Sequence, residues 1–178
     1  GPALSGFARP GRVQLAQDAL LAAGADISLG GTVDTGGRIV IRGRQVLVGG
    51  ALVTVETVKD GAQTGIDVRA SEEITVTGVT GRSIIETLAT GSGRGGDVLL
   101  GAPLVQVDFS SVNTRATGQG APGNVVVEAG RLSVTGGGTL GSMSESPGRG
   151  AGGGTTRQRR AGVGNARPPA GGATSAEP

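Results

Sequence analysis

The sequence contains no His and no Cys, so the features that could take part in chemistry are its carboxylates and its glycine-rich loops. The common nucleophile–base pairs are therefore unavailable. The segment Gly91–Gly96, GSGRGG, satisfies the GxGxxG pattern of dinucleotide-binding loops. Phosphate binding by that pattern needs a helix directly after the loop, whereas here the strand-like DVLL follows. We therefore interpret the segment as a corner loop.

Acidic residues beside glycines indicate a second kind of site. Asp67, Asp97 and Asn124 fall near the starts of successive repeats, where they would stack as a ladder. Calcium-binding β-rolls need tandem GGxGxD copies, and Gly95-Gly96-Asp97 is a single copy. Capping of backbone groups at a turn is thus the favoured role, with metal binding as the alternative.

Glu72 and Glu73 form an adjacent carboxylate pair. Neighbouring residues of a strand point to opposite faces, so a solvated turn is favoured over general acid–base catalysis. The sequence therefore predicts no catalytic residue, no cofactor-binding residue, no cofactor and no metal ligand. We expect the protein not to be an enzyme.

Basic residues gather in the C-terminal tail. Residues 151–178 hold four arginines and one glutamate, whereas the first 150 residues hold 12 basic and 13 acidic groups. The segment Thr155–Arg160, TTRQRR, could contact nucleic acid, but arginine makes up 15 of the 16 basic residues, which favours compositional bias. A neutral body with only Phe7 and Phe109 as aromatics argues against nucleic-acid binding. No apolar window is long enough for membrane insertion.

The elements that position these residues are short alternating apolar runs. The clearest set lies in Gly123–Ser144, GNVVVEAGRLSVTGGGTLGSMS, where three runs are separated by gaps too short for a helix. Similar three-run units start at Gly11, Gly37, Gly65, Gly96 and Gly123, 26 to 31 residues apart. The second runs are 19–22, 46–48, 74–76, 104–107 and 132–134, and the third runs are 27–29, 52–55, 83–85, 111–114 and 139–143.

This pattern predicts an all-β parallel β-helix with three-strand coils and about five rungs. Each strand would pair with its counterpart one turn away, at about 4.8 Å. Val, Ile and Leu would form inward columns, and glycines would turn the corners. The predicted organisation is a lead-in (1–10), the repeats (11–149) and a disordered Gly/Pro/Arg-rich tail (150–178). A β-sandwich is the alternative, because evenly spaced strands also suit that fold.

The repeat units resemble those of large exoproteins of the filamentous haemagglutinin family. The residues that carry the resemblance are GDVLLGAPLVQVDFSSVNTRATGQGAPGNVVVEAGRLSVTGGGTLGSMSESPGRGAGG (96–153), and it covers about residues 11–150. It implies a right-handed parallel β-helix that a Gram-negative bacterium secretes by the two-partner route. The implied partners are an outer-membrane pore transporter during secretion, and then host or neighbouring-cell surfaces or glycans. The implied location is secreted or cell-surface.

Two features depart from a whole exoprotein. The family's secretion domain, with its Asn-Pro-Asn-Gly-type motif, is not seen, and the chain begins with Gly1 instead of Met. The last unit is also followed by no recognisable cap. We therefore expect this chain to be a piece of a longer protein.

The sequence thus predicts a non-catalytic structural and adhesive stalk segment. The alternative is a fragment of a β-helical carbohydrate-active enzyme, which clustered acidic side chains on a flat face would favour. A third hypothesis is a surface row of threonines that contacts ice or glycans, but Thr54, Thr75 and Thr77 are few.

Overall fold

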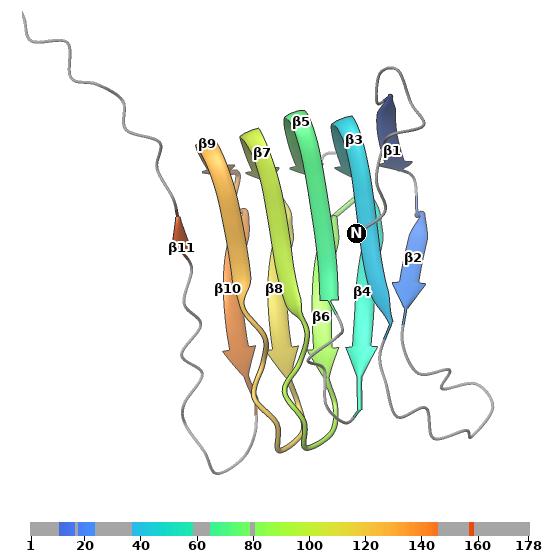
Figure 1. Cartoon of the computed structure of the whole chain (residues 1–178), viewed down its shortest axis with the longest axis vertical. Coiled ribbons are helices and arrows are strands. Elements are labelled where there is room, and N and C mark those ends of the chain that lie inside the picture. Colours follow the sequence, from blue (N-terminus) through green and yellow to red (C-terminus); the bar gives the residue numbers. More distant parts are fainter. Residues whose placement is uncertain are drawn as a thin grey trace, which may run out of the picture.

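The alternating runs form parallel β-strands that stack into a solenoid of about four turns in the computed structural model (Figure 1). The structure describes residues 11–16, 18–23, 37–58, 65–78, 81–145 and 157–158. Every strand pairing among these residues is parallel. The prediction of a parallel β-helix is therefore confirmed, and the sandwich alternative, which needs antiparallel pairs, is wrong.

The strands divide into a long and a short class. Their bounds are β1 (Arg12–Ala16), β2 (Leu20–Ala23), β3 (Arg38–Gly49), β4 (Leu52–Thr57), β5 (Gly65–Thr77), β6 (Ile84–Ala89), β7 (Asp97–Asp108), β8 (Ser111–Ala116), β9 (Val125–Thr135), β10 (Thr139–Ser144) and β11 (Arg157–Gln158). One sheet has the order β1-β3-β5-β7-β9-β11, and the other has the order β10-β8-β6-β4-β2.

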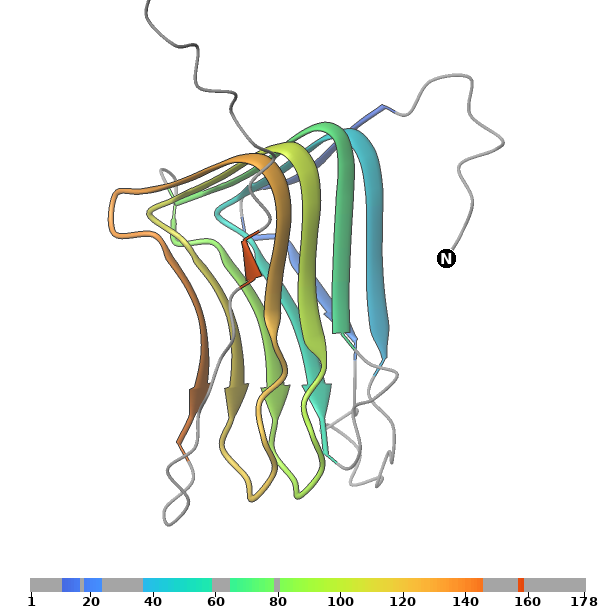
Figure 2. The ribbon, with the colours of Figure 1, turned by 60° about the vertical axis from the view of Figure 1, so that its left-hand side comes forward.

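The long strands β3, β5, β7 and β9 bend near their middle (Figure 2). The pairing register is interrupted there, between Gly43 and Gln45 in β3 and between Arg69 and Glu73 in β5. The first two predicted runs of a unit are thus halves of one bent strand. We call the first halves side one, the second halves with β1 side two, and β2, β4, β6, β8 and β10 side three.

Inward-facing aliphatic side chains form the expected columns. These are Ile39/Ile66/Val98/Val125 and Ile41/Val68/Leu100/Val127 on side one, Val13/Val46/Ile74/Val105/Leu132 and Leu15/Val48/Val76/Val107/Val134 on side two, and Leu21/Val53/Ile85/Val112/Leu140 on side three. Their central members are fully buried. Each such side chain contributes about 1.5–3 kcal/mol on burial, so the columns are the main stabilising feature.

The first unit differs from its expected phase. The sequence places a unit start at Gly11, but β1 pairs with the second half of β3, with Val13 opposite Val46. The prediction that a unit starts at Gly11 is therefore wrong by one run: β1 is a second run, on side two, and β2 is a third run, on side three. Apolar and polar residues alternate in the same way on all three sides, so alternation alone does not select the partner of β1. The pairing with β3 is fixed by the inward columns and by the corner that follows, where Asp18 N donates to Gly50 O (2.8 Å).

Some predictions fall on residues that the structure does not describe. The lead-in (1–10), the third run of the first unit (27–29) and most of the predicted tail (150–178) lie outside the described residues. Within that tail, β11 is described, and it pairs with Val126 and Val127 of β9. The first sheet thus continues for two residues into the segment that the sequence predicts to be disordered.

Candidate functional site

The GxGxxG segment Gly91–Gly96 joins β6 to β7 and is followed by a strand. Its interpretation as a corner loop is confirmed. The loop of the next coil packs directly on it, since Gly120 N donates to Gly91 O (3.0 Å). A Cβ on Gly120 would lie 1.8 Å from Gly93 O, so the glycines are needed for close stacking of the two loops.

Two of the three predicted ladder residues stack. Asp97 Oδ1 accepts hydrogen bonds from the backbone N–H of Asn124 (2.7 Å) and from its side-chain amide (3.3 Å). Asp97 therefore caps a backbone group, as expected. Asp67 is not part of the ladder, because it lies opposite Leu99. The inward column that places Ile66 on Val98 sets this register.

Asp67 instead lies at the centre of an arginine cluster on side one. It is 6% exposed and accepts hydrogen bonds from Arg42 Nη2 (2.5 Å), Arg38 Nη2 (3.1 Å) and Arg69 Nε (3.3 Å). Burial alone would raise its pKa, but the Arg42 hydrogen bond and the three guanidinium charges outweigh burial and lower the pKa. Arg69 also pairs with Glu128 (3.2 Å). The carboxylate is thus saturated by the chain itself.

The remaining predicted features do not come together. Glu72 pairs with Arg44 (3.5 Å), whereas Glu73 accepts hydrogen bonds from Gln106 (2.5 Å) and Thr75 (3.0 Å). The two glutamates therefore have separate structural partners. The threonines are divided as well, because Thr54 lies in β4 on side three and Thr75 and Thr77 lie in β5 on side two.

The described part of the chain offers neither a metal cluster nor a spanning helix. Within it, no three His, Cys, Asp or Glu side chains are grouped so that they could hold a metal ion. A search of the same residues finds no helix with the length and apolar character needed to cross a membrane.

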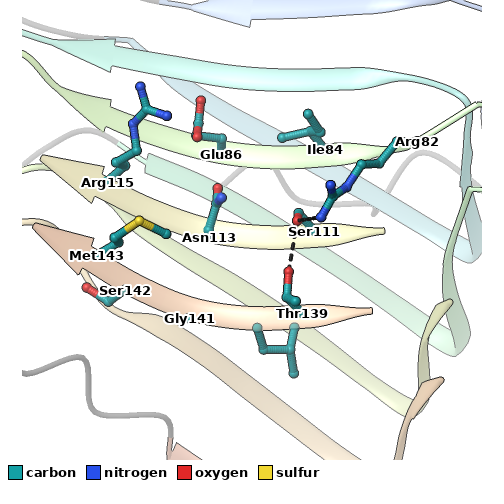
Figure 3. Close-up of a pocket in the computed structure, with 11 residues that line it drawn as sticks. Arg82, Ile84, Glu86, Ser111, Asn113, Arg115, Thr139, Gly141, Ser142 and Met143 are labelled. Atoms are coloured by element: carbon teal, nitrogen blue, oxygen red, sulfur yellow. Dashed lines mark hydrogen bonds between the residues drawn. The ribbon is translucent and has the colours of Figure 1, made fainter. Parts of the chain in front are cut away.

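A groove on the outer surface of side three was not identified from the sequence. It has a volume of about 580 Å³ and crosses β6, β8 and β10 (Figure 3). It is lined by Arg82, Ile84, Glu86, Ser111, Asn113, Arg115, Thr139, Leu140, Gly141, Ser142 and Met143. Gly141 ends the outward row Thr54/Glu86/Asn113/Gly141, and a Cβ there would meet nothing within 4 Å. The missing side chain opens the groove beside Asn113.

Two polar atoms in the groove lack a hydrogen-bond partner. Asn113 Oδ1 and Arg115 Nε are both buried and unpaired by hydrogen bonds. The nearest ion-pair contact of Arg115 Nε is with Glu145 Oε1, at 3.8 Å. Buried polar atoms in folded proteins nearly always have a partner. The lining of the groove therefore contains one acceptor, Asn113 Oδ1, and one donor, Arg115 Nε, that lie just below the accessible surface without a hydrogen bond.

At the other end of the groove, the side chains of Arg82, Ser111 and Thr139 are linked by hydrogen bonds. Arg82 Nη2 donates to Ser111 Oγ (3.1 Å), and Ser111 Oγ lies 2.8 Å from Thr139 Oγ1, as the dashed lines in Figure 3 show. Arg82 also lines a second hollow of about 340 Å³, together with Gly78, Phe109, Gly136 and Gly137. The two hollows thus share one guanidinium group.

Comparisons with known proteins assign no family to this chain. No protein-family model matches it, and neither a curated protein nor a solved structure matches it. The fold is therefore established by the structure itself.

Proposed function

We propose that this chain is a non-catalytic structural and adhesive segment of a secreted or cell-surface exoprotein of the filamentous haemagglutinin type. In this proposal the solenoid is a rigid support, and the side-three groove holds a polar ligand. The observation that carries it is the groove itself, whose lining residues Asn113 and Arg115 each bury a polar atom, Oδ1 and Nε, that has no hydrogen bond. Passage through an outer-membrane pore transporter belongs to the same proposal and rests on the resemblance of the repeats.

A glycan is the ligand class that best suits the groove. Sugar hydroxyls both donate and accept hydrogen bonds, so one ring can pair with Asn113 Oδ1 and Arg115 Nε when these two side chains turn toward the groove. Ser111 and Thr139 add two hydroxyl groups. Glycans of host or neighbouring-cell surfaces would therefore be the partners.

The alternative is a fragment of a carbohydrate-active enzyme. Glycoside hydrolysis usually needs two carboxyl groups, one on each side of the scissile bond. Glu86 is the acidic residue that lines the described groove. This arrangement favours binding over hydrolysis.

The experiment compares the wild-type chain with Gly141→Leu and Thr54→Leu. Leucine at position 141 fills the groove, whereas position 54 lies in the same outward row on β4 but does not line the groove. Binding is measured on a glycan array and then by calorimetry with chitohexaose and a hyaluronan hexasaccharide. We expect Gly141→Leu to weaken binding at least tenfold and Thr54→Leu to leave it within about twofold, since only the first removes contacts.

Three results would overturn the proposal. The first is the absence of glycan binding by the wild-type chain. The second is an equal loss of binding in both variants while their urea midpoints match the wild type. The third is the release of reducing or unsaturated sugar ends from either hexasaccharide, which would establish the enzyme alternative.

A further inference from the structure

The corner between sides two and three requires a left-handed backbone in several coils. Asp18 has φ 63°, Gly50 has φ 63° and Gly136 has φ 58°. Phe109 occupies the equivalent corner after β7 and has φ 49°. Glycine adopts this conformation freely, whereas the Cβ of an L-residue comes too close to the following carbonyl oxygen in it. Phe109 is therefore a strained residue where glycine would be the relaxed choice.

The neighbouring coils hold Phe109 in this conformation. Gly78 N donates to Asp108 O (2.9 Å), and Phe109 N donates to Thr135 O (3.3 Å), so backbone hydrogen bonds fix the corner on both sides. A Cβ on Gly136 would lie 2.6 Å from Cδ2 and Cε2 of the Phe109 ring. The ring thus lies directly against Gly136. Such strain persists where the surroundings over-determine it, often at functional positions.

Core packing does not account for the phenylalanine. Phe109 is 58% exposed, so it is not part of the buried core. The ring and Arg82 line the corner hollow, and Arg82 continues into the side-three groove, where it contacts Ser111. An exposed aromatic ring and a shared guanidinium group therefore lie at the end of a polar groove.

We propose that Phe109 is a stacking platform for a sugar ring, and that the corner hollow and the side-three groove hold successive rings of one oligosaccharide. This inference rests on the proposed function of the groove. The apolar C–H face of a sugar ring packs on the aromatic face, and polar groups around it fix the orientation. Arg82 lines both hollows, so it would donate to hydroxyl or carboxylate groups of the sugar rings on either side of it.

The experiment uses the full chain with Phe109→Gly and Phe109→Tyr. Glycine removes both the strain and the platform, so we expect the melting temperature to rise by about 2–4 °C. We expect the affinity for the bound hexasaccharide, chitohexaose or the hyaluronan hexasaccharide, to fall at least tenfold. Tyrosine keeps the ring, so its affinity should stay within about threefold and its melting temperature should stay unchanged.

The outcomes separate this inference from the proposed function. If Phe109→Gly keeps wild-type affinity while Gly141→Leu loses it, the platform is wrong and the groove function stands. A lower melting temperature for Phe109→Gly would contradict the strain argument. Tighter binding of single-stranded oligo(dT) than of either hexasaccharide would overturn the ligand class, because bases also stack on aromatic rings.

Discussion

Asp67 is a carboxylate on the outer surface that is nevertheless only 6% exposed, because three arginines cover it. A charge removed from water is unfavourable unless it is paired. Arg42 pairs with the carboxylate (2.5 Å) and also donates to the backbone oxygen of Asp67 (2.8 Å). Asp67 is therefore a structural centre of side one.

Replacing Asp67 by Asn should destabilise the chain by about 1–3 kcal/mol at pH 7, because a charged hydrogen-bond acceptor is lost. The folded pKa of Asp67 is lowered, so its stabilisation is present above the unfolded value of about 3.9. It is lost as the pH falls through the lowered folded pKa. Urea unfolding at pH 7 and at pH 2 should thus show a deficit for Asp67→Asn that shrinks in acid.

The control for this prediction is Glu72→Gln. Glu72 and Arg44 are about half exposed, and exposed ion pairs contribute little. Its unfolding curve should match the wild type within about 0.5 kcal/mol at both pH values. A deficit of Asp67→Asn that is the same at pH 2 and pH 7 would show that its charge is not the cause.

Corner loops are attached to side three by hydroxyl groups inside the solenoid. Thr87 Oγ1 donates to Gly96 O (2.6 Å), and Thr114 Oγ1 donates to Gly123 O (2.7 Å). Ser142 Oγ repeats the contact with Gly123 O at 3.0 Å. These inward hydroxyls interrupt the aliphatic core at positions aligned from coil to coil. They satisfy carbonyls that the loops would otherwise leave buried and unpaired.

Replacing Thr114 by Val keeps the shape of the side chain but removes this donor. We expect a loss of about 0.5–1.5 kcal/mol in the free energy of unfolding, because the Gly123 carbonyl loses one hydroxyl donor and keeps the one from Ser142. Thr135→Val is the matched control, since Thr135 is exposed and its hydroxyl bonds to Asp108 (2.7 Å). It should change stability by less than about 0.5 kcal/mol. Equal losses in both variants, measured by urea titration, would exclude this role for Thr114.

The described coils form a linear stack in which the strands of one coil pair with those of the next, so burial depends on position along the stack. Val107 and Val134 occupy the same inward column in adjacent coils. Val107 is 0% exposed, whereas Val134, in the last described coil, is 41% exposed. A valine in the middle of the stack should therefore contribute more to the free energy of unfolding than a valine in the last described coil.

Truncation of these two valines tests the linear character of the stack. Val107→Ala removes two buried methyl groups and leaves a cavity, so we expect a loss of about 2 kcal/mol. Val134→Ala should cost less than about 0.5 kcal/mol, because its side chain is already partly in water. Urea midpoints of the two variants give the comparison. A loss at Val134 as large as that at Val107 would indicate that the end of the stack is covered in solution.

Alternation and repeat spacing, read from the sequence alone, determined the strands, the parallel stacking and the aliphatic columns. These properties depend on local patterns, such as Gly123–Ser144, in which each inward residue recurs one coil later. The glycine corners were also predictable, since close stacking at Gly120 leaves no room for a side chain. The last unit was expected to lack a strand beyond it, whereas β11 continues its first half.

Only the tertiary structure decided which residues of adjacent coils lie side by side. The side that β1 joins, the arginine cluster around Asp67 and the row that ends at Gly141 all depend on register between coils about 30 residues apart in the chain. Insertions in the corner loops change that register without changing the alternation. The strain at Phe109 is likewise a property of the corner backbone, which residue types do not reveal. The groove and its unpaired atoms arise from these non-local contacts.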